Sequence, residues 1–132
     1  MSRQLLVVED DPIFTFLLEK AITSANLKGD INKFSNGLTA IEYLKMEYHQ
    51  HEKYIIFLDL NMSIMNGWQF MEILNGLANE DNCMVFVVTS SKNQSDLDIL
   101  RENPMVADFI TKPITEPIIQ EIKVMIETRF DK

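Results

Sequence analysis

Side chains suited to phosphate and metal chemistry follow four of the apolar runs in this sequence. They are three carboxylates, a hydroxyl and an ammonium group, at Glu9, Asp10, Asp59, Thr89 and Lys112. Three carboxylates held close together repel one another unless a cation neutralises them. Mg²⁺ suits such a set, because it prefers hard oxygen ligands and is usually bound by one or two carboxylates together with phosphate oxygens. The residue types therefore predict a magnesium-dependent phosphate site.

Each group has a predicted role in that site. Lys112 would neutralise a phosphate as a point charge, and Thr89 would donate a hydrogen bond to it. Asp59 is the candidate nucleophile, since carboxylates can form acyl phosphates. Phosphoryl transfer asks a protein mainly for in-line positioning and electrostatic stabilisation, which these side chains can supply.

The apolar runs themselves predict the architecture. Most are uninterrupted, which is typical of strands buried on both faces of a parallel sheet. We predict five strands, each followed by a helix, at residues 5–8, 30–35, 55–58, 84–88 and 107–110. This alternation predicts an α/β fold, a three-layer α/β/α sandwich with a five-stranded parallel sheet and five helices. Ligands bind outside the carboxyl ends of the strands in such sheets, where the polar side chains would converge.

Local signals predict where the helices begin and which way they face. Asp11 before Pro12 predicts an N-cap followed by the first helical position. Ser95 with Asp98 predicts a capping pair for the fourth helix, and the last helix is expected to start near Pro117. Helical spacing predicts that three helices turn these residues inward: Ile13, Phe14, Leu17, Leu18, Ala21 and Ile22; Leu38, Ile41 and Leu44; Ile118, Ile119, Ile122, Met125 and Ile126.

Composition limits the protein class. A length of 132 residues suits one domain, so we expect residues 1–132 to form a single unit. The net charge of −8 argues against nucleic-acid binding, which needs clustered lysine and arginine. No apolar stretch approaches the ~20 residues of a membrane helix, so no membrane partner is expected. The single cysteine, Cys83, predicts packing rather than a disulfide and, with no secretory signal pattern, a cytoplasmic location.

Two other polar features have simpler explanations than metal binding. His49 and His51 are spaced as a metal pair could be, but no third ligand lies nearby in the sequence, which favours a solvated loop. Asp11 adjoins the acidic pair at residues 9 and 10, yet N-capping already accounts for its place before Pro12.

The whole chain resembles the receiver domain of two-component response regulators. The motifs that carry the resemblance are VVEDDP, FLDLNM, VVTSS and FITKP. It implies a flavodoxin-like sheet of order 2-1-3-4-5. It also implies phosphorylation of Asp59 and a metal site made by Glu9, Asp10, Asp59 and the main-chain carbonyl of Asn61.

The resemblance further implies a switch. Thr89 would move toward the phosphoryl group and Phe109 would rotate inward, which would alter the surface formed by the fourth helix, the fifth strand and the fifth helix. It implies a cis Lys112-Pro113 bond, and lifetime tuning at Asn61 and Ser91. The chain departs from the usual receiver sequence at two positions. Ser63 replaces a frequent proline, and Phe109 replaces a frequent tyrosine. Because Phe109 has no hydroxyl, the switch would be coupled through the packing of its ring.

The function implied is that of a signalling phosphoacceptor rather than an enzyme. The phosphoryl donor would be a sensor histidine kinase or a histidine phosphotransfer protein, and the output an unidentified protein contact. The protein would be a monomer or a phosphorylation-dependent dimer. We expect no output domain after the last helix, although a relay intermediate or a receiver cut from a longer protein is equally compatible with the sequence.

Two alternatives differ in function class. A magnesium-dependent phosphatase of the haloacid-dehalogenase kind would place a second aspartate two residues after the nucleophile, where this chain has Asn61; turnover of small phosphate esters would favour it. A flavodoxin-like module would bind flavin or a nucleotide, but carboxylates stand where a phosphate-cradling glycine loop would follow the first strand. A bound yellow cofactor would favour that module.

Overall fold

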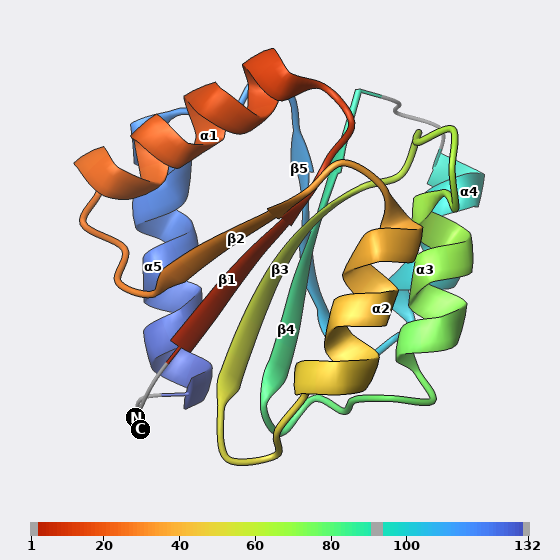
Figure 1. Ribbon diagram of the computed structural model, residues 1–132. Helices are drawn as coiled ribbons and strands as arrows, with labels where there is room; N and C mark the ends of the chain where they lie inside the picture. Colours follow the sequence, from red (N-terminus) through yellow and green to blue (C-terminus); the bar gives the residue numbers. More distant parts are fainter. Residues whose placement is uncertain (1–2, 91–93, 131–132) are drawn as a thin grey trace.

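Strands and helices alternate strictly along the chain and build one parallel sheet (Figure 1). The structure is a computed structural model that describes residues 3–90 and 94–130. Its elements are β1 (Arg3–Val8), α1 (Pro12–Ser24), β2 (Asp30–Phe34), α2 (Gly37–Glu47), β3 (Lys53–Asp59), α3 (Gly67–Leu74), β4 (Cys83–Thr89), α4 (Gln94–Arg101), β5 (Val106–Thr111) and α5 (Glu116–Phe130). The strand order is β2-β1-β3-β4-β5, which confirms the predicted topology.

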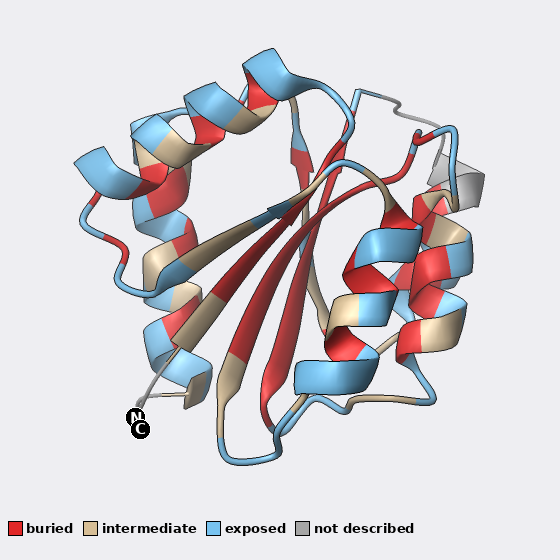
Figure 2. Cartoon of the chain, viewed as in Figure 1, coloured by how far each residue is buried: buried red, intermediate tan, exposed pale blue. Residues whose placement is uncertain are grey.

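The sheet separates two cores. Helices α1 and α5 cover one face, and α2, α3 and α4 cover the other (Figure 1). Strands β1, β3 and β4 are largely buried (Figure 2). Their alternate residues serve different cores: Leu6 and Val8 pack toward α2 and α3, whereas Leu5 and Val7 pack toward α1 and α5. This explains why the apolar runs of these strands are uninterrupted.

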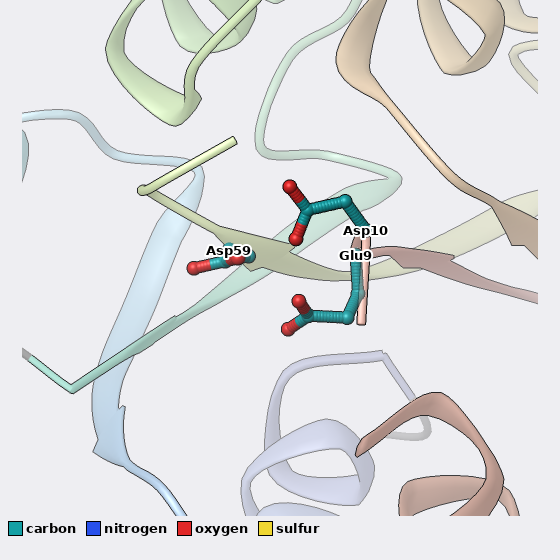
Figure 3. A group of neighbouring side chains, drawn as sticks. All are labelled: Glu9, Asp10 and Asp59. Carbon is teal, nitrogen blue, oxygen red and sulfur yellow. The ribbon is translucent and has the colours of Figure 1, made fainter. Parts of the chain in front are cut away.

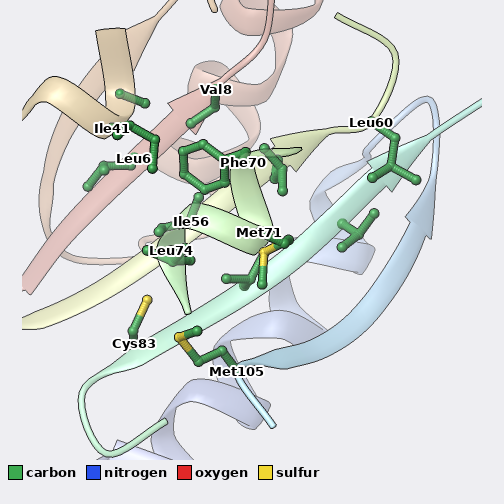
Figure 4. Packing of buried hydrophobic residues seen from close by; sticks show 14 of the residues in the cluster. Leu6, Val8, Ile41, Ile56, Leu60, Phe70, Met71, Leu74, Cys83 and Met105 are labelled. Atoms are coloured by element: carbon green, nitrogen blue, oxygen red, sulfur yellow. The ribbon is translucent and has the colours of Figure 1, made fainter. Parts of the chain in front are cut away.

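The single cysteine belongs to the α2–α4 core. Cys83 lies among apolar side chains near Leu74 and Met105 (Figure 4). Burial raises the pKa of the Cys83 thiol to about 12, so the reactive thiolate is not formed near neutral pH. The prediction of a packing role is confirmed.

Short polar side chains start the helices. Asp11 Oδ1 accepts hydrogen bonds from the Ile13 and Phe14 amides at 2.9 and 3.4 Å, which confirms the predicted N-cap of α1. At α3, Asn66 and Gln69 form a capping box of two 3.0 Å hydrogen bonds, in each of which a backbone amide donates to the side-chain oxygen of the other residue. The capping pair predicted at Ser95 is wrong, because α4 already includes Gln94 and Ser95 lies inside the helix.

The predicted inward-facing stripes are too wide. On α1 the buried row is Phe14, Leu18 and Ile22, whose i, i+4, i+8 spacing faces the sheet. Ile13 and Leu17 are 70% and 51% exposed, because the row one residue earlier turns toward solvent. Four further predicted positions are also less buried than a core position would be: Leu38 is exposed, and Ala21, Ile118 and Met125 are only partly buried against the core.

Among residues 3–90 and 94–130, no helix combines the length and the apolar character needed to cross a membrane.

Gly67 permits the close approach of α3 to the end of β3. A Cβ built there would lie 2.5 Å from Leu60 Cδ2 and 2.8 Å from Leu60 Cα, distances that force the backbone apart. At Gly76 the corresponding nearest atom is Ile73 O at 3.5 Å, an ordinary contact. The absence of a side chain at Gly67 thus lets the start of α3 pack directly against Leu60, the residue after Asp59.

We expect Gly67→Ala to lower the free energy of unfolding by about 1–3 kcal/mol, because the added methyl group overpacks this junction. Urea denaturation followed by circular dichroism measures the effect. Gly76→Ala is the matched control and should change stability by less than about 0.5 kcal/mol. Equal stabilities of the two variants would contradict the close packing at Gly67.

Candidate functional site

Three carboxylates meet at the carboxyl end of the sheet. Glu9 and Asp10 follow β1, and Asp59 ends β3 (Figure 3). One oxygen of each lies within 4.8 Å of the others. The parallel pairing of Val8 with Leu58 places Glu9 beside Asp59, so the strand register itself brings the acids together.

The three acids differ in their exposure to water. Glu9 and Asp59 are each 4% exposed, whereas Asp10 is exposed. Two charges are therefore partly removed from water while the third stays at the rim. This arrangement leaves the cluster accessible from one side.

Glu9 has two polar contacts and a raised pKa. Its Oε2 accepts a 3.1 Å hydrogen bond from the Asp11 amide, and Lys112 Nζ lies 2.9 Å from its Oε1. Oε1 is buried, and the Lys112 ammonium group is its close charge partner. Burial raises the pKa of Glu9 to about 7, Lys112 opposes the rise, and Asp59 adds to it.

These features fit a divalent cation. Carboxylates held close together and partly removed from water are costly unless positive charge balances them, and the single Lys112 ammonium group does not balance three acids. Two buried carboxylates and a third exposed one supply the hard oxygen ligands that Mg²⁺ prefers, and the exposed side leaves room for water. Glu9, Asp10 and Asp59 can therefore hold a metal ion.

The loop after β3 starts from Asp59. The Asn61 amide donates a 3.1 Å hydrogen bond to Asp59 Oδ1, which orients the carboxylate. Asn61 and Ser63 are exposed, and Met65 adopts a left-handed φ of 56°. The role of the Asn61 carbonyl as a metal ligand stays a prediction.

Thr89 is the last residue of β4, and Lys112 directly follows β5. Asp59 pairs in register with Val88, so Thr89 lies one residue beyond it at the same sheet edge, with 2% exposure. The Lys112 amide donates to the Thr89 carbonyl at 3.1 Å. Lys112 Nζ reaches to 3.8 Å from Asp59 Oδ2, and the Lys112-Pro113 bond is cis, as the resemblance implied.

Phe109 lies on β5, three residues before Lys112. It pairs with Val87 within the sheet and packs partly against the α2–α4 core. The guanidinium of Arg101, from α4, lies 4.6 Å from the centroid of the Phe109 ring. Phe109 thus connects β5 with α4, and its role as a switch stays a prediction.

The sequence also singled out residues that do not join the carboxylate cluster in the structure. His49 and His51 are exposed; the His51 amide donates to His49 Nδ1, and neither joins a group of three metal-ligating side chains within the described ranges. Asp11 caps α1 rather than joining the carboxylate cluster. Ser91 lies outside the described residues.

One neighbour of the site was not predicted from the sequence. Lys112 Nζ lies 4.5 Å from the ring centroid of Phe14, on the first turn of α1. No sequence signal links residues 14 and 112, because their contact arises only when α1 packs beside the end of β5. Sequence patterning predicts Phe14 simply as core.

Comparisons with known proteins agree with the geometry. Residues 5–123 match the family model described as the response regulator receiver domain. This match favours the receiver interpretation over the phosphatase and flavodoxin alternatives.

Solved structures share the fold at low sequence identity. A two-component response regulator from Cytophaga hutchinsonii is 22% identical, with a TM-score of 0.85 over 96% of this chain and 98% of that one. The receiver domain of a sensor histidine kinase from Pseudomonas aeruginosa, solved with magnesium in its active-site cleft, is 18% identical, with a TM-score of 0.73 over both entire chains. A phosphorylated cyanobacterial phytochrome response regulator is 21% identical, with a TM-score of 0.73 over 98% of this chain and 94% of that one.

The raised pKa of Glu9 predicts a pH-dependent stability of the metal-free protein. The folded state retains the Glu9 proton to higher pH than the unfolded chain, whose pKa is near 4.5. Stability from this group is therefore present below pH 4.5 and lost as the pH rises through about 7. Glu9→Gln stays neutral, so its stability advantage over the parent should grow between pH 5 and pH 8, by on the order of 1–3 kcal/mol.

Urea denaturation in the presence of a chelator measures this difference. Glu80→Gln, at an exposed position, is the control and should follow the pH profile of the parent. Parallel profiles for Glu9→Gln and the parent would show that burial does not raise the pKa of Glu9.

Proposed function

This chain belongs to the response regulator receiver domain family, and from that premise we propose that Asp59 accepts a phosphoryl group from a phosphohistidine donor. The observation that carries the proposal is the convergence of Glu9, Asp10 and Lys112 on the Asp59 carboxylate. A carboxylate surrounded by other acids and one ammonium group is equipped to bind a metal ion and a phosphate together.

In the proposed step an Asp59 carboxylate oxygen attacks phosphorus. The new bond is P–O, and the bond that breaks is the P–N bond of the donor histidine, whose nitrogen keeps the electron pair and takes up a proton. Lys112 would donate an N–H group to a phosphoryl oxygen, consistent with its position 3.8 Å from Asp59 Oδ2. The product is an aspartyl phosphate, and the donor is regenerated by its own kinase.

We propose Mg²⁺ as the ion, held by Glu9, Asp10, Asp59 and the Asn61 carbonyl. When bound, it neutralises the negative charge that gathers on the phosphoryl oxygens and the nucleophile. The protein's own contribution is to hold the acids together before the ion arrives, through the pairing of β1 with β3.

Thr89 and Phe109 are the proposed switch. A hydroxyl at the edge of β4 could move toward a phosphoryl group on Asp59, and Phe109 lies on the strand that adjoins β4. The output would then be a change in the surface of α4, β5 and α5 that an unidentified partner protein reads, with phosphorylation favouring a pre-existing state. We propose that residues 1–132 act as one signalling unit rather than as an enzyme that turns over a substrate.

Incubation with acetyl phosphate and Mg²⁺, followed by intact mass measurement, tests the phosphoacceptor. We expect one phosphoryl adduct on the parent, none on Asp59→Asn, and none when a chelator replaces Mg²⁺. Asp30→Asn, at an exposed aspartate on the edge strand, should be phosphorylated like the parent. An adduct that persists on Asp59→Asn would assign the phosphoryl group to another residue.

This chain has an exposed apolar surface beside the acids that the donor protein could contact. Ile13, Phe16 and Leu17 are 70%, 59% and 51% exposed and share the outer face of α1. Phe16 also lines one hollow together with Glu9 and Asp10, so this apolar patch adjoins the phosphorylation site. Exposed apolar patches of this kind mark protein contacts, and we propose that this one contacts the histidine donor.

Phe16→Ser should slow phosphotransfer from a phosphorylated histidine phosphotransfer domain roughly tenfold, as expected for the loss of an aromatic contact residue. Its rate with acetyl phosphate should not change, because the small donor needs no docking surface. Met46→Ser, at an 82% exposed position at the far end of α2, is the control. Equal slowing with both donors would show that Phe16 acts on the site rather than on docking.

A further inference from the structure

The Lys112 ammonium group has three neighbours of different kinds. Glu9 Oε1 lies at 2.9 Å, Asp59 Oδ2 at 3.8 Å, and the ring centroid of Phe14 at 4.5 Å. These groups come from the ends of β1 and β3 and from the first turn of α1. The ammonium group thus has two carboxylates and one aromatic face as neighbours.

Phe14 is held firmly in place. Its side chain is 8% exposed and belongs to the core between the sheet, α1 and α5. Its amide donates a hydrogen bond to Asp11 Oδ1, so the N-cap of α1 also fixes the backbone position of Phe14. A ring fixed by both its backbone and its packing provides a rigid surface for a flexible lysine.

We propose that Phe14 is a positioning residue for phosphoryl transfer, whose ring holds the Lys112 ammonium where it meets the phosphoryl group. The inference rests on the proposed function, since it concerns how the phosphoryl-binding lysine is placed. The face of an aromatic ring carries negative electrostatic potential and attracts a cation within about 6 Å.

An aromatic ring has two advantages over the other possible neighbours. A carboxylate at this position would add a fourth negative charge and would accept N–H groups that the phosphoryl oxygens need. An aliphatic side chain would remove water from the ammonium group without compensation. The Phe14 ring attracts the charge and leaves the N–H donors available.

The ring should matter most when a cation occupies the acids. A divalent ion neutralises Glu9 and Asp59, so their attraction for Lys112 weakens as the ion binds. The attraction of the Phe14 ring is unaffected by that neutralisation. Phe14 therefore retains Lys112 in the state in which the lysine is needed.

Two replacements of Phe14 separate ring electrostatics from packing. Phe14→Leu keeps an apolar side chain without a π-face, and pentafluorophenylalanine keeps the ring shape but reverses its electrostatic potential. The ligands are Mg²⁺ alone, measured by calorimetry, and beryllofluoride as a phosphoryl mimic in saturating Mg²⁺, measured by fluorine NMR. We expect both replacements to weaken beryllofluoride binding roughly three- to tenfold, as the loss of a cation–π contact implies, with Mg²⁺ affinity unchanged within twofold.

The outcomes are distinct. If pentafluorophenylalanine binds beryllofluoride as the parent does, Phe14 acts through packing alone and the inference is wrong. If the Phe14→Leu effect persists at full size in a Lys112→Met background, Phe14 does not act through the lysine, and the inference is again wrong. If the parent itself binds no beryllofluoride, the proposed phosphoacceptor function fails, independently of the role of Phe14.

Discussion

The mutual repulsion of three carboxylates at one sheet edge is the constraint on which this structure depends. Glu9 and Asp59 are nearly buried, and the only ammonium group near both, among the described residues, is that of Lys112, 2.9 Å from Glu9 and 3.8 Å from Asp59. Such an arrangement costs stability, and it persists because the surrounding structure leaves the acids no other place. The hydrogen-bonded pairing of β1 with β3, buried on both faces, provides that support.

The carboxyl edge of the sheet also connects the acids to the opposite layer. Lys112 and Phe109 are three residues apart around the end of β5, and they face different neighbours. Lys112 meets the acids and Phe14, on the α1 side, whereas Phe109 meets Arg101 of α4. Asp59 and α4 are therefore connected through the end of β5, because Lys112 lies near Asp59 and Phe109 contacts Arg101. This proximity is what the proposed switch requires physically.

Helix α1 serves the site in three ways, and only one was predicted from its sequence. Asp11 caps the helix, as predicted, and so places the first turn beside the acids. The buried row supplies Phe14, which reaches Lys112. The exposed face supplies an outer apolar patch of Ile13, Phe16 and Leu17, of which Ile13 and Leu17 were predicted as core. The error arose because a helix on a sheet buries one i, i+4 row, while apolar residues outside that row are equally compatible with the helical period.

The sequence by itself determined the order and type of the elements, the strand ends at which polar residues stand, and the cap at Asp11. These are local properties, since periodicity, N-capping and turn residues act within a few positions of the chain. Tertiary structure alone decided the raised pKa of Glu9, the contact of Lys112 with Phe14, and the exposure of Ile13 and Leu17. Each depends on burial or on distances between segments far apart in the chain, which local patterning does not specify.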